Sequence, residues 1–125
     1  MFRNIVIICL LFIFTACSSK KPIYTNSSIV LFKAPQFKFY DKGFISKYND
    51  HIHLQIFQVG QIALDLKVYK DEVCLSKIEC LSSKQFNKEY LSSSYSDSFL
   101  YNLLSQEKIY FKDKKNNILI KVKNN

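Results

Sequence analysis

The side chains that could do chemistry in this 125-residue chain are its cysteines and histidines. His51 and His53 are separated by one residue, so in a strand both imidazoles would lie on one face and could bind the same metal ion. No third ligand lies at a suitable spacing, and the wetter face of a hairpin is an ordinary place for histidine. We therefore expect no metal site and no cofactor.

Sequence motifs of enzymes are missing. The chain contains no glycine-rich phosphate loop, no Gly-x-Ser-x-Gly elbow and no paired carboxylates in a recognisable setting. Asp97 could act as an acid or base, but a carboxylate just before an apolar helical segment is far more often a helix cap. We therefore expect a protein that is not an enzyme.

The N-terminal residues have the pattern of an export signal. Arg3 precedes an unbroken apolar run over residues 5–14, and the small residues Thr15 and Ala16 come directly before Cys17. This order is typical of a secretory signal. The run is about half of the roughly twenty residues that a membrane-spanning helix needs, so a permanent transmembrane helix is disfavoured.

Residues 14–17, Phe-Thr-Ala-Cys, resemble the lipobox of bacterial lipoproteins. The resemblance implies that residues 1–16 are a signal peptide and that a diacylglyceryl group is attached to the thiol of Cys17, which becomes the first residue. Ser18, in place of Asp, resembles lipoproteins that are sorted to the outer membrane. The expected location is therefore the cell envelope, on the outer membrane facing the periplasm. A signal peptide cleaved elsewhere is the alternative.

Cys74 and Cys80 are the cysteines that remain once Cys9 leaves with the signal and Cys17 takes the lipid. An extracytoplasmic compartment favours their oxidation, so we predict a structural disulfide, with free thiols as the alternative. A metal site at these thiols is disfavoured, because no histidine or second cysteine pair lies nearby at ligand spacing.

The chain is basic, with a formal charge of +8 that falls to +7 when Arg3 leaves with residues 1–16. An exported protein tethered to a membrane does not normally meet nucleic acid. If a basic patch on the domain has a partner, an anionic lipid or glycolipid surface therefore fits better. A composition rich in Lys, Asn, Ile, Phe and Tyr can also produce this charge without any partner.

A short apolar run predicts a strand over residues 29–32, and period-two alternation predicts strands over residues 36–40, 51–57 and 61–69. Residues 44–48 and 72–75 should form two further short extended segments. Pro35 predicts an edge or a bend, and residues 41–43, Asp-Lys-Gly, predict a turn. Residues 51–57 and 61–69 are separated only by Gln-Val-Gly, so they should pair as an antiparallel hairpin. Its buried face would hold Ile52, Leu54, Ile56, Ile62, Leu64, Leu66 and Val68.

After Cys80 the apolar period changes from two to about 3.6. Ser82 and Gln85 form a capping box that predicts a short helix with Phe86 and Tyr90 on one face. Asp97 or Ser96 would cap a second helix, whose apolar stripe is Phe99, Leu100, Leu103 and Leu104. Residues 107–112 and 117–123 should then form a closing hairpin.

These elements predict an α+β fold, in which a curved antiparallel sheet or unclosed barrel has two short helices on one face. An all-β sandwich is the alternative, and it would require residues 82–105 to be extended. Residues 17–27 are polar and aperiodic, so we expect them to be the lipidated tether. Residues 28–125 would then form a single small domain.

The hairpin region resembles the outer-membrane lipoprotein receptor family LolB. The resemblance covers residues 43–75, where Gly43-Phe44, Leu54-Gln-Ile56, Val59-Gly-Gln61 and Val73-Cys-Leu75 follow the family's order. It implies an unclosed barrel over helices with an apolar cavity for lipoprotein acyl chains. The loop that inserts into the membrane in that family would correspond to residues 58–60. This chain is shorter than such proteins and has no tryptophan.

Two functions remain open at this point. The domain could bind lipid or lipoprotein acyl chains in a cavity lined by its many aromatic rings, although the same rings also fill a core efficiently. It could instead be a structural or adhesive envelope protein that contacts another protein through an exposed apolar patch. In both hypotheses the membrane is reached through the lipid on Cys17.

Overall fold

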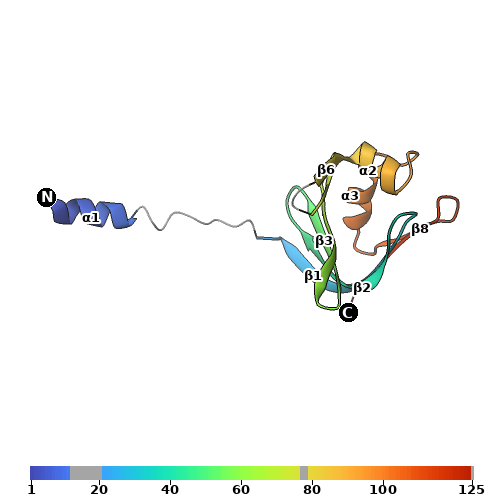
Figure 1. Ribbon diagram of the computed structural model, residues 1–125, viewed down its shortest axis with the longest axis horizontal. Helices are drawn as coiled ribbons and strands as arrows, with labels where there is room; N and C mark the ends of the chain where they lie inside the picture. Colours follow the sequence, from blue (N-terminus) through green and yellow to red (C-terminus); the bar gives the residue numbers. More distant parts are fainter. Residues whose placement is uncertain (12–20, 77–78, 125) are drawn as a thin grey trace.

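The computed structural model describes residues 1–11, 21–76 and 79–124 (Figure 1). Within them, eight strands form one antiparallel sheet in the order β6-β5-β4-β3-β2-β1-β8-β7. The strands are β1 (Tyr24–Lys33), β2 (Lys38–Lys47), β3 (Ile52–Gln58), β4 (Gln61–Val68), β5 (Glu72–Leu75), β6 (Glu79–Ser82), β7 (Tyr110–Asp113) and β8 (Ile118–Asn124). The helices are α1 (Phe2–Leu11), α2 (Ser83–Tyr90) and α3 (Phe99–Leu104).

The sheet is curved and does not close, because β6 and β7 at its two ends do not pair with each other. Both α2 and α3 lie inside the curve, on one face of the sheet (Figure 1). The predicted α+β fold is therefore confirmed. The all-β sandwich is wrong, because the stretch that it needed in extended form contains two helices.

The hydrophobic core lies between the concave face of the sheet and these two helices. Alternate side chains of the strands point into it, as the period of two requires. Fully buried members are Val30, Phe32, Leu54, Ile56, Leu66, Val68, Phe86 and Ile120. Every buried hydrophobic residue of the described chain lies within residues 30–120, so a chain that begins at residue 21 keeps the whole core and all strand pairs.

The turn predicted at residues 41–43 is wrong. β2 runs straight through them and pairs with β1 over its whole length. The reversal instead lies at Pro35, where the backbone N–H and C=O groups of Ala34 and Phe37 bond to each other at 2.7 and 3.2 Å. Gly43 serves close packing, since a Cβ there would lie 2.5 Å from the carbonyl oxygen of Gln55 on β3.

β1 begins at Tyr24, four residues before the expected start of the domain at Ser28. Residues 24–27 are polar but pair in register with the end of β2, from Tyr24 opposite Lys47 to Ser27 opposite Phe44. The tether therefore ends earlier than predicted. Backbone pairing, which polarity does not report, decides this boundary.

The predicted β3–β4 hairpin is confirmed, with Val59 and Gly60 as its turn. Its buried face holds the expected side chains except Ile62, which is 52% exposed. The pairing register between β3 and β4 shifts at this point. Ile56 pairs with Leu64, but the next residue of β3, Phe57, pairs with Ile62, so β4 has one extra residue. This bulge pairs Ile62 with a residue of the outer face.

The C-terminal elements also follow the sequence pattern. The Oγ of Ser82 accepts a 3.2 Å hydrogen bond from the Gln85 N–H at the start of α2, as predicted. The cap predicted for α3 at Asp97 or Ser96 is wrong, because Ser98 occupies that position without a side-chain cap hydrogen bond. The closing hairpin is β7–β8, and its pairing with β1 completes the sheet.

Cys17 and the first part of the predicted tether, residues 17–20, lie outside the described residues. In the part of the chain that the structure describes, no helix is long and apolar enough to cross a membrane. The lipidation site thus remains a prediction from the sequence.

Candidate functional site

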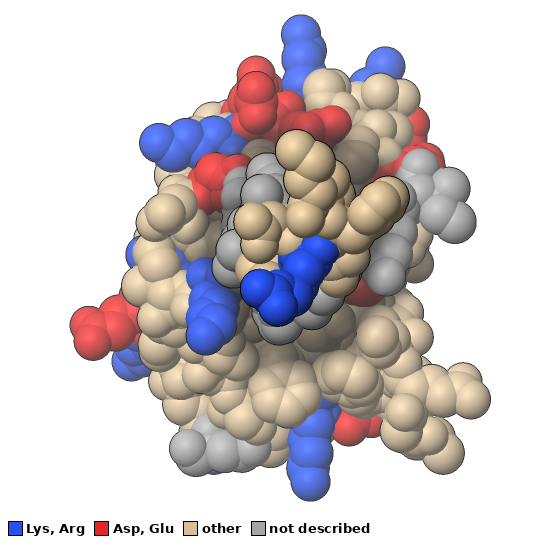
Figure 2. All heavy atoms as spheres, turned by 90° about the vertical axis from the view of Figure 1, so that its left-hand side faces the viewer, with Lys and Arg blue, Asp and Glu red and all other residues tan. Residues whose placement is uncertain are grey.

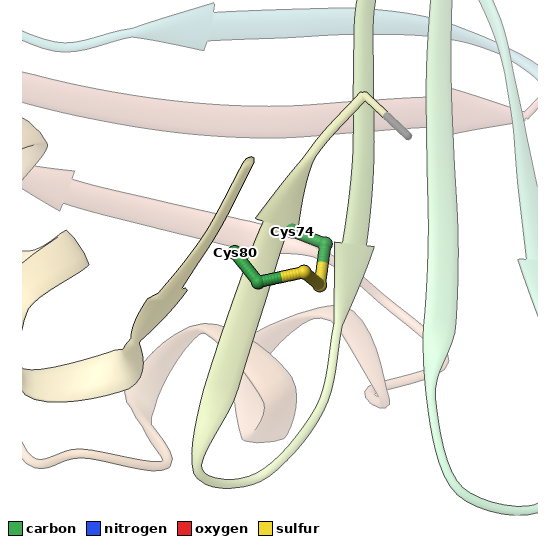
Figure 3. Close-up of a disulfide and its surroundings, with 2 residues drawn as sticks. All are labelled: Cys74 and Cys80. Atoms are coloured by element: carbon green, nitrogen blue, oxygen red, sulfur yellow. A yellow bond between two sulfur atoms is a disulfide. The ribbon is translucent and has the colours of Figure 1, made fainter. Parts of the chain in front are cut away.

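Cys74 and Cys80 form the predicted disulfide, with an S–S distance of 2.06 Å (Figure 3). The two residues are directly paired across β5 and β6, so the bond joins the edge strand β6 to its neighbour. A carboxylate oxygen of Glu72 and both sulfurs lie within 4.8 Å of one another. Sulfurs bonded to each other lack the thiolate that binds a metal, so this cluster has no metal-binding chemistry while oxidised.

His51 and His53 occupy two separate environments. The ring of His51 is stacked between Tyr48 and Tyr69, with centroid distances of 4.4 and 4.9 Å. Its Nδ1 lies 2.7 Å from Asp50 Oδ1.

On the outer face of the β3–β4 hairpin, His53 Nε2 lies 2.5 Å from Asp65 Oδ1. Neither histidine belongs to a cluster of three metal-ligating side chains among the described residues. Both imidazoles therefore have structural partners.

A side-chain hydrogen bond between Tyr95 and Asp113 joins the segment before α3 to the β7–β8 hairpin. The Tyr95 hydroxyl donates a 2.5 Å hydrogen bond to Asp113 Oδ2, and the Asn116 side chain donates another at 2.7 Å. Burial raises the pKa of Tyr95, and the bond to Asp113 raises it further. The same bond is the main cause that holds the pKa of Asp113 below its usual value. Asp97 is exposed and lies outside this network.

A pocket of about 410 Å³ opens at one end of the half-barrel, between the sheet and the segment that leaves α3. This volume lies in the range of small-molecule sites. Its apolar residues are Ile45, Leu104, Ile109 and Val122, and its polar residues are Tyr24, Asn26, Ser28, Lys47, Ser105, Gln106, Glu107 and Asn124. A lining that combines apolar and polar side chains is the arrangement that binds an amphiphilic molecule.

Hydrogen bonds hold part of the polar lining in place. Ser28 is fully buried, and its Oγ donates a 3.1 Å bond to Asn124 Oδ1. Ser105 Oγ bonds the Tyr101 carbonyl oxygen at 2.6 Å, which holds the end of α3 against the next segment. Lys47 and Glu107 give the lining one charge of each sign. The pocket is thus partly preorganised and carries no net charge.

Sequence reasoning did not locate this pocket. Its walls come from three distant parts of the chain, which meet only because β8 pairs with β1, with Asn124 opposite Ser28. Residues 24–28 are polar, and the sequence predicts that most of them belong to the tether. Their composition therefore does not indicate that they line a binding pocket.

Of residues 58–60, which the resemblance aligns with a membrane-inserting loop, Gln58 ends β3 and Val59 and Gly60 form the tight β3–β4 turn. Val59 at its tip is fully exposed. Comparison with protein-family models, with curated proteins and with solved structures finds no match to this chain.

Proposed function

We propose that this chain is a non-catalytic, membrane-anchored envelope lipoprotein whose domain binds an acyl chain or a similar amphiphile in the pocket beneath α3. The observation that supports this most directly is the pocket itself, whose lining includes the apolar side chains of Ile45, Leu104, Ile109 and Val122. An acyl chain would be covered there, while its polar end would meet Lys47 and the amides at the rim.

The position of the pocket also fits an anchored protein. Tyr24 and Asn26 line it, and they follow directly on the segment predicted to carry the lipid on Cys17. Residues 18–23 would span at most about 20 Å when fully extended. A domain anchored in this way would hold its pocket close to a lipid surface, where amphiphilic ligands are concentrated.

A pocket-filling variant tests the ligand proposal. Asn26 is half-buried and points into the pocket, whereas Ser27 is exposed on the opposite face of β1. With the chain beginning at residue 21, we expect Asn26→Trp to weaken binding of the fluorescent fatty acid cis-parinaric acid by at least about tenfold, or 1.4 kcal/mol. The control Ser27→Trp should bind as the wild type does. Equal binding by both variants, or no binding by the wild type, would contradict the proposal.

The anchor has its own test. Metabolic labelling with a palmitate analogue should label the full chain and not Cys17→Ala, because that substitution removes the thiol that accepts the diacylglyceryl group. Unchanged labelling of the variant would refute lipidation at this residue.

One observation favours the alternative of a protein-contacting envelope component. Phe44 and Ile62 are 40% and 52% exposed on the outer face, and the ring of Phe57 lies between them, 5.6 Å from that of Phe44. A photo-crosslinking residue at position 62 should capture a specific envelope protein if this patch is a contact. A crosslinker at Lys67, on the same face of β4, is the control. Identical products from both positions would argue against the contact.

A further inference from the structure

We propose that the outer face of strands β7, β8, β1 and β2 docks on an anionic lipid surface. We call it the lysine face, and it is defined by the outward residues Lys33, Lys38, Lys42, Lys112, Lys121 and Lys123 together with Ile29, Leu31, Tyr40, Tyr110 and Leu119. This inference stands on these residues and is independent of the ligand in the pocket.

Strand pairing arranges the lysine face in three rows. The first row is Lys42, Ile29 and Lys123; the second is Tyr40, Leu31, Lys121 and Tyr110; the third is Lys38, Lys33, Leu119 and Lys112. Directly paired side chains lie about 5 Å apart at Cβ, so the six lysines share one continuous surface. All of them are exposed except Lys33, which is half-buried.

None of the outward positions in these rows holds a carboxylate. Asp41 and Asp113 belong to the same strands but lie at inward positions, opposite Val30 and Ile118. None of the six lysines takes part in an ion pair among the described residues. Lys33 and Lys38 even face each other directly, an arrangement that is unfavourable without an external anion.

On other parts of the surface, charged side chains are distributed differently from those on the lysine face. Figure 2 shows one side of the molecule, on which lysines and acidic side chains are interspersed among uncharged residues. On the outer face of the β3–β4 hairpin, His53 bonds Asp65, and Lys67 follows two residues later. The excess of positive charge is therefore concentrated on one half of the sheet.

The apolar residues of the lysine face favour a lipid surface over a nucleic acid. A hollow of about 400 Å³ is lined by Ile29, Leu31, Tyr40, Lys121 and Lys123, with aliphatic side chains at its centre. Lysine stems and tyrosine rings place apolar carbons at the headgroup boundary and their polar ends in water. Bases would instead need aromatic faces on which to stack, and the two rings of this face, Tyr40 and Tyr110, lie at opposite ends of their row with the aliphatic Leu31 and the stem of Lys121 between them.

Vesicle flotation with the chain beginning at residue 21 tests this docking without the lipid anchor. The wild type should bind vesicles of phosphatidylcholine with phosphatidylglycerol and not vesicles of phosphatidylcholine alone. Each lysine near an anionic surface raises the membrane-binding constant about fivefold. The triple variant Lys42→Gln/Lys121→Gln/Lys123→Gln should therefore weaken binding to these vesicles on the order of 100-fold. High salt should reduce wild-type binding.

The matched control is Lys67→Gln/Lys84→Gln/Lys88→Gln, which removes the same charge from β4 and α2. It should lose less than about fivefold, because these lysines lie off the lysine face. Equal losses in both triple variants, or no wild-type binding to anionic vesicles, would overturn the proposal. Tighter binding to a single-stranded oligonucleotide than to anionic vesicles would overturn it as well.

Two readouts separate this docking from the pocket proposal. Asn26→Trp should leave vesicle binding unchanged, and the lysine-face triple variant should leave binding of cis-parinaric acid unchanged. Far-UV circular dichroism should show that each variant keeps the wild-type fold. A loss of vesicle binding in Asn26→Trp equal to that in the triple variant would contradict docking through the lysine face.

Discussion

The two halves of the outer face of the sheet satisfy their polar groups in different ways. On β3–β6, His53 is bonded to Asp65, and Cys74 is bonded to Cys80. On β7, β8, β1 and β2, the lysine face has six cations and no carboxylate. One half therefore joins a histidine to a carboxylate and a cysteine to a cysteine within the molecule, and the other carries lysines without an ion pair among the described residues.

This difference does not extend to the interior. Both halves contribute fully buried side chains to a single core, for example Phe32 from β1 and Leu66 from β4. The division is thus a property of the surface, which means that the halves can differ in function without differing in stability. Mutations in the shared core and on the two surfaces can test these two properties separately.

The largest effect is expected in the shared core. Phe32→Ala in one half and Leu66→Ala in the other should each lower the free energy of unfolding by about 2–5 kcal/mol, since both leave a cavity. Urea unfolding followed by circular dichroism should give one transition in each case. Loss of hydrogen-exchange protection in only the mutated half would show that the halves are separate cooperative units.

Removing the disulfide should lower stability less than the core substitutions do, and its local effect should be confined to β5 and β6. Cys74→Ala/Cys80→Ala should lower the free energy of unfolding by about 2 kcal/mol, because a short loop is no longer closed in the unfolded chain. Hydrogen exchange should rise in β5 and β6 while the lysine face keeps its protection. An equal rise in β8 would contradict a local effect.

A smaller, pH-dependent effect is expected at Asp113, the carboxylate at the end of β7. Folding lowers its pKa below the ordinary value of 3.8, so its charged form stabilises the fold above that value. This stabilisation is lost as the pH falls through the lowered pKa.

Asp113→Asn should therefore lower Tm at neutral pH, and the gap to the wild type should shrink in acid. Thermal melts over a pH series measure it. The exposed Asp97, mutated to Asn, is the control, and an equal gap there would argue against a specific role for the Tyr95 bond.

The smallest effect is expected from one charge change on the lysine face. Lys38→Glu converts the like-charged pair with Lys33 into an opposite pair and should raise the free energy of unfolding by about 0.5 kcal/mol at low salt. Salt should remove most of this gain. Lys67→Glu, next to Asp65 in the other half, should destabilise instead. The same sign for both variants would contradict the contrast between the halves.

Local patterns predicted most elements because they depend on neighbours in the sequence. Alternation over residues 51–69 placed the β3–β4 hairpin correctly, and Ser82 with Gln85 marked the start of α2. The sequence failed where a distant partner decides. Gly43 suggested a turn, but it is needed for close approach to Gln55, and β6, which forms by pairing with β5, was not predicted.

The chemistry-bearing residues divide in the same way. The pairing of Cys74 with Cys80 was predictable from a short separation and an expected oxidising compartment. The bulge that turns Ile62 outward, and the separate partners of His51 and His53, were not, since each depends on residues of another strand or loop.

By itself, the sequence determined the order of every strand except β6, the two helices that follow it, the cysteine pair and the signal-like N-terminus, because each is encoded in residues close together along the chain. Only the tertiary structure decided where β8 lies. Its pairing with β1 creates one wall of the pocket, and it also aligns Lys121 and Lys123 with Lys42 across the outer face. Both proposed surfaces follow from that contact between residues about 90 positions apart, which local physical chemistry does not specify.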